Sequence, residues 1–412
     1  MTLDTAAPLK SGWRRVKFGD VVRLSKARSQ SPLADGLERY VGLEHLEPGD
    51  LRIRSWGNVA DGTTFTNRFE PGQVLFGKRR AYQRKVAVAD FAGVCSGDIY
   101  VLESKDAGVL LPELLPFICQ TDAFFEHAVG TSAGSLSPRT NWTSLAEFQF
   151  ELPLIDEQAR LSGLLACARE SVESSASALD AAKVMLRSGL VSIFATEGSS
   201  PATVEMSQAV VRPEWRLVTA ADISVVPITK GATPSGATGV SDTGIPFLKV
   251  YNLTFDGSLD FSIEPTFVAP EVHSKELARS RVQAGDVLMN IVGPPLGKVS
   301  ILPPNFPSAN INQAIARFRM REGIYPGYIA AYLLSDWAQR WLGSRSKKTS
   351  GQQNLTLELC QTLPVPLPPD HLVESVVSAI ETLFESVRRT EERKSATYRT
   401  YKRILNEVVG DV

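Results

Sequence analysis

Eight consecutive residues, from Lys78 to Lys85, place five cationic side chains beside one tyrosine and one glutamine. Ammonium and guanidinium groups bind phosphates, and the guanidinium fork also fits O6 and N7 of guanine. Such a cluster is often only a solvated turn, so its setting in the chain has to decide between the two interpretations. We predict a nucleic-acid contact, made by Lys78, Arg79, Arg80, Tyr82, Arg84 and Lys85.

Polar loops rich in serine, glycine and side-chain amides form a second group of candidates. Glutamine and asparagine can pair bidentately with adenine, and neighbouring lysine and arginine can hold phosphates. The alternative for any one of these residues is a polar surface turn that caps a helix. The candidates are Arg139, Asn141, Asn290, Lys298, Asn312, Gln313, Lys347, Lys348, Gln352, Gln353 and Asn354.

The elements that must position these loops occur twice in the chain. The stretch that begins at Gly12-Trp13-Arg14 has a counterpart at Glu214-Trp215-Arg216, and the segment 71–76 has one at 284–289. The loop 130–141 is matched by the loop 346–355. A period of about 210 residues is too long for a solenoid, so the sequence indicates duplication of a whole domain together with the helix that follows it. Two loops that differ inside matching frames are typical of two readers of different base sequences.

Each copy is predicted to be a mixed α and β domain. Strands are expected at Arg39–Leu43, Gln73–Phe76, Lys85–Ala89 and Asp98–Leu102, bounded by glycine, proline and aspartate. One helix is expected from Pro112 to about Val129 and its equivalent from Tyr325 to Leu342, each followed by a polar loop.

A long amphipathic helix is predicted after each domain. The apolar seam of the first consists of Leu161, Leu165, Ala168, Val172, Leu179, Ala182, Leu186 and Ile193; that of the second consists of Val373, Val376, Ile380, Leu383, Val387, Tyr401, Ile404 and Val408. Heptad spacing over about 40 residues, or about 60 Å, favours an intramolecular antiparallel coiled coil over two helices that each pack on their own domain. The predicted fold is therefore α+β, with domains at 1–155 and 201–368 and coiled-coil helices at 156–200 and 369–412.

The middle of this seam is polar, with Ser175 on the first helix and Thr390 and Lys394 on the second. Two interpretations stay open. One is a solvated gap or a polar layer that fixes the register of the coil, and the other is a docking place for another subunit.

Catalytic patterns do not emerge from the sequence. The segment 72–78 has phosphate-loop spacing but continues with Arg79 instead of serine or threonine, and the four histidines lack ligand or triad spacing. Composition is that of a globular protein, with a net charge of −1, four scattered cysteines and no apolar segment of spanning length. We expect a cytoplasmic, non-catalytic chain without its own cofactor or metal and without membrane contact.

These features resemble the specificity subunit of type I restriction-modification systems, over nearly the whole chain. The resemblance rests on residues 71–85, Cys95-Ser96-Gly97-Asp98, residues 285–298 and Ser350-Gly351-Gln352-Gln353-Asn354-Leu355. Its most specific marker is Leu152-Pro153-Leu154-Ile155-Asp156-Glu157-Gln158 at the start of the first long helix. The second copy, 367–373, keeps the prolines but lacks Glu-Gln.

The resemblance implies two target-recognition domains, each of which reads one half of a split double-stranded DNA sequence. It implies helices that fix the gap and bind methyltransferase subunits, two in number, with Glu157, Gln158, Thr390 and Lys394 as the expected contacts. S-adenosylmethionine and ATP are expected on partners, namely the methyltransferase and the restriction/translocase subunits. The alternatives are a specificity module of a different methyltransferase–nuclease architecture and a two-headed protein-binding scaffold without DNA contact.

Overall fold

The computed structural model describes residues 12–194, 212, 214–235, 243–349 and 351–409. The linker 198–201, where we placed the second domain boundary, lies outside them, as do the N-terminal residues 1–11 and Ser350. The chain divides into two compact units, residues 1–174 with 395–412 and residues 175–394. Each unit thus combines a globular body, which we call domain one and domain two, with one half of each long helix.

Domain one contains two four-stranded sheets and one strand pair. The first sheet has the order β2-β9-β6-β7, from Val22–Leu24, Ile99–Ser104, Val74–Gly77 and Val86–Val88. The second has the order β4-β3-β8-β5, from Gly57–Asn58, Arg39–Val41, Gly93–Cys95 and Asn67–Phe69. The pair joins β1, Arg14–Lys17, to β10, Gln149–Leu152. Short helices are α1, Phe18–Val21, and the 3₁₀ turns η1, Leu43–His45, η2, Val59–Asp61, and η3, Ala81–Gln83.

Domain two repeats this topology strand for strand. Its first sheet has the order β12-β20-β16-β18, from Thr229–Lys230, Ile315–Phe318, Val287–Asn290 and Val299–Ile301. Its second sheet has the order β14-β13-β19-β15, from Phe267–Val268, Ile245–Leu248, Ala309–Ile311 and Arg281–Val282. The pair joins β11, Arg216–Thr219, to β23, Pro364–Leu367. The pairing β3–β8 is parallel, and so is its equivalent β13–β19. The short helices are η5, Val250–Asn252, α6, Pro270–Ser274, and η6, Ala278–Ser280. The internal repeat that the sequence predicted is confirmed.

The single helix predicted late in each domain is wrong in both copies, because each is broken in the middle. In domain one the helices are α2, Leu115–Ile118, and α3, Asp122–Gly130. They are separated at Thr121, whose hydroxyl accepts a hydrogen bond from the Phe124 amide. In domain two α7, Pro326–Leu334, and α8, Asp336–Arg345, are separated at Ser335, which accepts the Ala338 amide. A hydroxyl residue followed by aspartate is a favoured helix start, since it caps a free N–H and places an anion at the positive end of the helix. A short helix ends each domain, α4 at Trp142–Ala146 and α9 at Leu357–Thr362.

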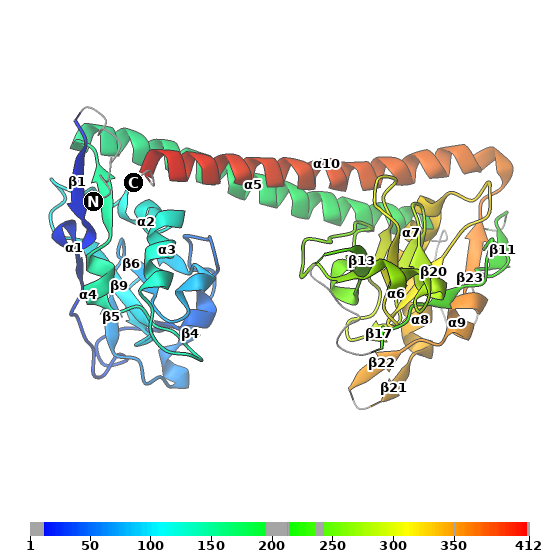
Figure 1. Ribbon diagram of the computed structural model, residues 1–412, viewed down its shortest axis with the longest axis horizontal. Coiled ribbons are helices and arrows are strands. Elements are labelled where there is room, and N and C mark those ends of the chain that lie inside the picture. Colours follow the sequence, from blue (N-terminus) through cyan, green and yellow to red (C-terminus); the bar gives the residue numbers. More distant parts are fainter. Residues whose placement is uncertain (1–11, 195–211, 213, 236–242, 350, 410–412) are drawn as a thin grey trace. The chain divides into compact units, whose positions relative to one another are not determined.

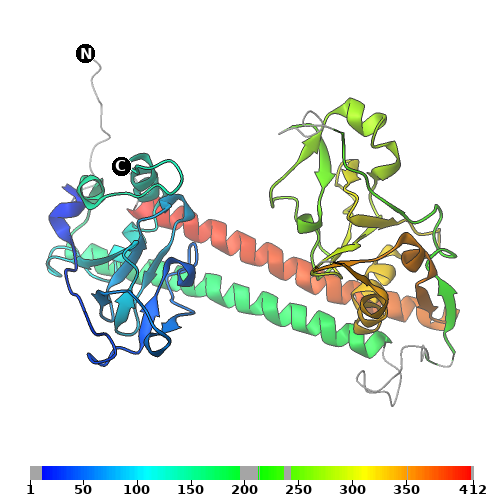
Figure 2. The same ribbon diagram turned by 90° about the horizontal axis from the view of Figure 1, so that it is seen from below.

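The two long helices are α5, Ile155–Phe194, and α10, Asp370–Val409, each of 40 residues. They pack antiparallel, as predicted, and lie side by side in both views (Figure 1, Figure 2). In unit one Leu161 and Leu165 share a core with Tyr401 and Leu405. In unit two a separate core contains residues of both helices, namely Leu179, Ala182, Leu186, Leu190, Ile380 and Val387.

Three details differ from the predicted seam. Leu405, not Ile404, is fully buried, and Val373 is 36% exposed. Gly189, which interrupts the apolar rhythm, leaves room for Leu383, because a Cβ at this glycine would lie 2.5 Å from the Leu383 Cδ1. The gap in the pattern is therefore a close contact of the two helices.

Candidate nucleic-acid interface

Two loops meet through the same backbone crossing in each domain. In domain one the loop after β6 is hydrogen-bonded to the loop after α3 through their backbones. The Thr140 amide donates to the Lys78 carbonyl at 3.1 Å, and the Arg80 amide donates to the Pro138 carbonyl at 2.7 Å. In domain two the Leu355 amide donates to the Ile291 carbonyl at 2.8 Å. The crossing makes Lys78 equivalent to Ile291 and Arg139 equivalent to Asn354.

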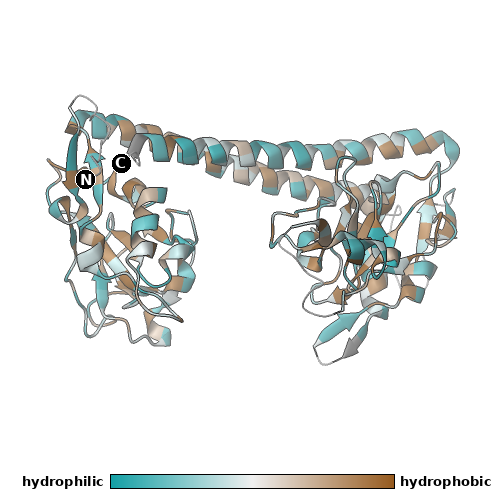
Figure 3. Ribbon diagram, in the orientation of Figure 1, coloured by the Kyte–Doolittle hydropathy of each residue, from teal (hydrophilic) through white to brown (hydrophobic). Residues whose placement is uncertain are grey.

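Domain two extends this crossing into a small sheet with the order β17-β22-β21. Its strands are Val292–Gly293, Gln352–Asn354 and Lys347–Thr349, and Gly351 has a positive φ of 83° in the turn between the last two. The hairpin β21–β22 projects from the body of unit two on the side away from its helices (Figure 1). It is drawn mostly in hydrophilic colours (Figure 3).

Domain one has isolated bridges at this place, which join Arg139 to Arg79 and to Ala133. Both guanidinium groups bind Asp98: Arg139 Nε lies 2.8 Å from Oδ1 and Arg79 Nη1 lies 3.2 Å from Oδ2. Arg79 also donates to the Ser137 hydroxyl at 3.0 Å. Although partial burial opposes ionisation of Asp98, the hydrogen bonds and charges of Arg139 and Arg79 outweigh it and lower the pKa of this carboxyl.

Arg79, Asp98 and Arg139 form a charge triplet, and other residues of the predicted cationic cluster lie around it. The Lys78 ammonium lies 4.6 Å from the centre of the Tyr100 ring, and burial lowers its pKa. Arg80 adopts a left-handed backbone with φ 54° and contacts Ser137. Tyr82 lies in η3 with its ring 55% exposed. Lys78, Arg79, Arg80 and Arg139 are thus brought together.

Arg84 and Lys85 are directed elsewhere. Arg84, also left-handed with φ 56°, forms an ion pair with Asp122 at the start of α3 and lies over the Phe125 ring. Lys85 donates to the Leu43 carbonyl at 2.7 Å, and Lys298 donates to the equivalent Val250 carbonyl at 3.3 Å. These two lysines stabilise the same 3₁₀ turn in both domains.

Several predicted amides hold loops in place. Asn290 has no exposed surface, and its side chain bonds the Val292 and Pro295 carbonyls and the Lys298 amide. It therefore stabilises this loop, and its contact with nucleic acid stays a prediction. The Asn312 side-chain oxygen accepts a hydrogen bond from the Ala314 amide. At the equivalent place in domain one, the Ser96 hydroxyl accepts one from the Asp98 amide. Asn141 caps α4 by accepting the Ser144 amide.

Five of the predicted amides and cations of domain two lie on the two strands of the hairpin. Lys347 and Gln352 are exposed, and Gln353 and Asn354 are half-buried. Lys348 lies on β21 between Lys347 and Thr349. Gln313, in the loop between β19 and β20, is exposed and accepts the Thr233 hydroxyl.

The residues predicted to dock subunits have different settings. Gln158 is 1% exposed, and its amide bonds the Leu111 amide and the Val109 and Pro153 carbonyls, each at 2.9 Å. Its side chain is thus bonded inside domain one, and its contact with another subunit stays a prediction. Glu157 pairs with Arg160, Thr390 donates to the Ser386 carbonyl, and Lys394 lies 3.4 Å from Glu391.

Asp98 is the residue that sequence reasoning missed. In the sequence it closes the segment Cys95-Ser96-Gly97-Asp98, and an acidic residue just before a strand can orient the cations of a neighbouring loop. In the part of the chain that the structure describes, no group of three or more histidine, cysteine, aspartate or glutamate residues could hold a metal ion. No described helix is long and apolar enough to cross a membrane.

Comparisons with known proteins give a consistent result. No model of a protein family matches the chain. The specificity subunit of the EcoDI type I restriction enzyme of Escherichia coli is 29% identical over 160 residues, which are 36% of this chain and 33% of that protein. The matched region thus spans only about a third of that relative.

Two solved structures share the fold over the full length. One, from work on complex assembly and conformational transition of the type I R-M system, has a TM-score of 0.57 at 19% identity and covers 98% of this chain and 99% of its own. The other, the type I restriction-modification S subunit of M. genitalium, has a TM-score of 0.55 at 14% identity and covers 100% and 99%. The resemblance to type I specificity subunits that the sequence motifs indicated is therefore confirmed, in sequence by one such subunit and in fold along the whole chain.

Proposed function

We propose that this chain is the DNA-recognition subunit of a type I restriction-modification complex. Each domain reads one half of a bipartite double-stranded target through the crossing of its two loops. The observation that carries the proposal is the pair of equivalent crossings, which have the same backbone bonds and different side chains. Base recognition needs this combination, since a fixed frame sets the register and variable side chains select the bases.

The chemistry of each crossing suits a DNA groove. In domain one, Asp98 holds the guanidinium planes of Arg79 and Arg139, which are 37% and 49% exposed. An arginine that is oriented before binding loses less conformational entropy when it pairs with guanine. In domain two the hairpin offers Gln352 and Gln353, whose amides fit adenine, next to the cation of Lys347.

The helices α5 and α10 fix the gap between the two half-sites and dock two methyltransferase subunits. With Gln158 buried, the outer face of α5 is a better docking candidate, because Val184 and Met185 are 57% and 61% exposed there. Contiguous exposed apolar surface marks protein contacts, and these two residues are neighbours on the helix. Glu157, Thr390 and Lys394 stay in the proposal as polar contacts.

The chain itself is proposed to be non-catalytic and to act in the cytoplasm. S-adenosylmethionine and ATP then bind to the methyltransferase and restriction/translocase partners. A net charge of −1 requires local basic contacts, with partner subunits supplying further contacts to phosphates.

Methylome sequencing tests the proposal directly. The chain would be expressed with its neighbouring methyltransferase gene in a host that lacks DNA methylation. We expect a new bipartite motif with one fixed gap. A continuous motif would favour a different methyltransferase architecture, and a stable complex without any modification would favour the protein-binding scaffold.

A further inference from the structure

Each domain is attached to the long helices at two separate places. The first is an apolar anchor at the end of α5, formed in unit two by the Phe194 ring, which packs against the Tyr328 and Tyr332 rings of the domain. The second is a charge pair nearer the middle of the helix. Since Lys183 lies eleven residues before Phe194, the two attachments of domain two are about 16 Å apart along α5.

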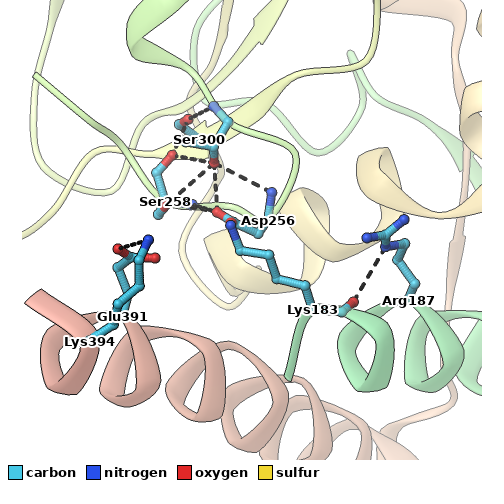
Figure 4. Close-up of polar contacts among 8 residues, drawn as sticks. Lys183, Arg187, Asp256, Ser258, Ser300, Glu391 and Lys394 are labelled. Atoms are coloured by element: carbon cyan, nitrogen blue, oxygen red, sulfur yellow. Dashed lines mark hydrogen bonds and ion pairs between the residues drawn. The ribbon is translucent and has the colours of Figure 1, made fainter. Parts of the chain in front are cut away.

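The second attachment of domain two is a buried carboxylate. The Lys183 ammonium lies 2.9 Å from Asp256 Oδ2, and Asp256 is 8% exposed (Figure 4). The other oxygen, Oδ1, accepts the hydroxyls of Thr254 at 2.7 Å and Ser258 at 2.6 Å. One oxygen therefore organises the loop of the domain, and the other binds the helix.

The same loop also contacts α10. Gly257 has a φ of 86°, and a Cβ at this position would lie 2.7 Å from the Phe384 ring. A side chain would clash here, so the loop approaches the helix closely only because this residue is glycine. Lys183 of α5 and Phe384 of α10 thus bind one loop of domain two from both helices.

Domain one has an equivalent attachment of reversed polarity. There the domain supplies the cation and α5 the carboxylate: Arg52 Nη2 lies 2.7 Å from Glu173 Oε2. Gly49 in the same loop faces Tyr398 of α10, with 3.6 Å between an ideal Cβ and the Tyr398 hydroxyl. Arg52 is 56% exposed and Glu173 21% exposed, so water screens this pair more than the buried pair of domain two.

A body held only at an apolar anchor can pivot about it, because hydrophobic contact has little directionality. A charged hydrogen bond about 16 Å away restricts that motion. We propose that the contact between Lys183 and Asp256 is a positioning contact, which fixes the tilt of domain two on α5 and thereby the DNA gap that the chain accepts. Lys183 and Asp256 act through the domain, without touching DNA.

Distance measurements in the full chain test the tilt independently of DNA. Spin labels on cysteines placed at Asp180 of α5 and Glu264 of domain two, in a Cys167→Ala background, report their separation; both positions are exposed. We expect one narrow distance distribution, which Lys183→Met broadens and Lys183→Arg restores. Arg187→Met is the matched control, since Arg187 is an exposed cation one turn further along α5 that does not contact Asp256 (Figure 4). A Lys183→Met distribution as narrow as that of the unchanged chain overturns the proposal.

Asp256→Asn provides a second variant if Lys183→Met does not fold. An asparagine oxygen can still accept the Thr254 and Ser258 hydroxyls, while the charge that holds Lys183 is lost. We expect the same broadening, and a narrow distribution in this folded variant overturns the proposal as well.

The consequence for DNA rests on the proposed function and has its own readout. The assembled complex would be titrated with duplexes that carry both half-sites at gaps one base pair shorter, equal and one base pair longer. We expect Lys183→Met to lower the preference for the correct gap about tenfold, on the scale of one lost charged hydrogen bond, with both half-site sequences unchanged. An equal loss of affinity at all gaps indicates a merely structural role and overturns the positioning role. If the unchanged complex binds no bipartite DNA, the proposed function fails, while the distance measurement still decides the tilt.

Discussion

The loop crossings of the two domains share their backbone and differ in almost every side chain. At equivalent positions domain one has Arg79, Asp98 and Arg139, whereas domain two has Val292, Ala314 and Asn354. The first crossing is a charge triplet, and the second is a hydrogen-bonded sheet that presents amides. Main-chain bonds hold the frame regardless of which side chains it bears, so recognition chemistry can change without loss of the fold.

The same comparison separates cations that make one contact in both domains from cations that occur in one domain only. Lys85 and Lys298 occupy equivalent positions and bind equivalent carbonyls, so each stabilises the same 3₁₀ turn of its domain. Arg79 has no charged counterpart in domain two, where the position is Val292. A charge that persists in both copies supports the fold, and one that differs is a candidate for specificity.

Reversing the charges of the triplet has the largest expected effect. Arg79→Glu with Arg80→Glu replaces two cations beside Asp98 with anions, which should weaken binding of the complex to its target by more than about 3 kcal/mol, or over a hundredfold. Binding to labelled duplex DNA measures this loss, and subunit assembly should survive. Arg14→Glu, on an exposed residue of β1, is the matched control. Unchanged binding by the double variant would remove the loop from the DNA surface.

The starts of α5 and α10 differ at one position, where α5 has the buried Gln158 and α10 has the partly exposed Val373. Gln158→Ala leaves the Leu111 amide and the Val109 and Pro153 carbonyls without their side-chain partner, so we expect unit one to lose about 3 kcal/mol of unfolding free energy. Val373 is the equivalent residue of α10 and is partly exposed; Val373→Ala should cost less than about 0.5 kcal/mol. Denaturant unfolding measures both, and similar losses in the two variants would contradict the assigned role of Gln158.

The hairpin of domain two should control one half-site only. Gln352→Ala with Gln353→Ala should reduce discrimination in that half-site by about 1–3 kcal/mol for each base pair that the amides read. Binding to duplexes with single substitutions in either half-site tests this, with the exposed Gln283→Ala as control. Equal effects on both half-sites would break the correspondence between domains and half-sites.

Asp98→Ala makes domain one resemble domain two, which has Ala314 at this position. Freed guanidinium groups still bind phosphates but lose their fixed direction, so base discrimination should fall by about 1 kcal/mol while affinity for unrelated DNA rises. Titrations with target and scrambled duplexes measure both. Loss of affinity for scrambled DNA would show that Asp98 does not restrain these arginines.

Acid should weaken the triplet in the unchanged protein. The pKa of Asp98 is lowered in the folded chain, so its contribution to stability is complete above the ordinary aspartate pKa near 4 and is lost as the pH falls through the folded value. The difference in unfolding free energy between the unchanged chain and Asp98→Asn should therefore shrink on acidification below about pH 4.

Much of the architecture followed from local pattern. Short β-rich runs bounded by glycine, proline and aspartate located β3, β6, β7 and β9 to within about two residues, and the heptads located both long helices. The breaks at Thr121 and Ser335 were missed because apolar periodicity continues across them, although each hydroxyl residue with its following aspartate is a visible start signal. The burial of Gln158 could not be predicted, since its partners Val109 and Leu111 lie over forty residues away in the chain.

By itself the sequence determined the duplication, the long helices and which loops hold cations and amides, because these depend on residue order and periodicity. Only the tertiary structure decided where each side chain points. Lys78 to Lys85 is one cluster in sequence, yet left-handed residues at Arg80 and Arg84 turn the chain. Arg79 therefore faces Asp98, Arg84 faces Asp122 and Lys85 faces a carbonyl, since neighbours in a loop share no common face and distant partners fix each direction.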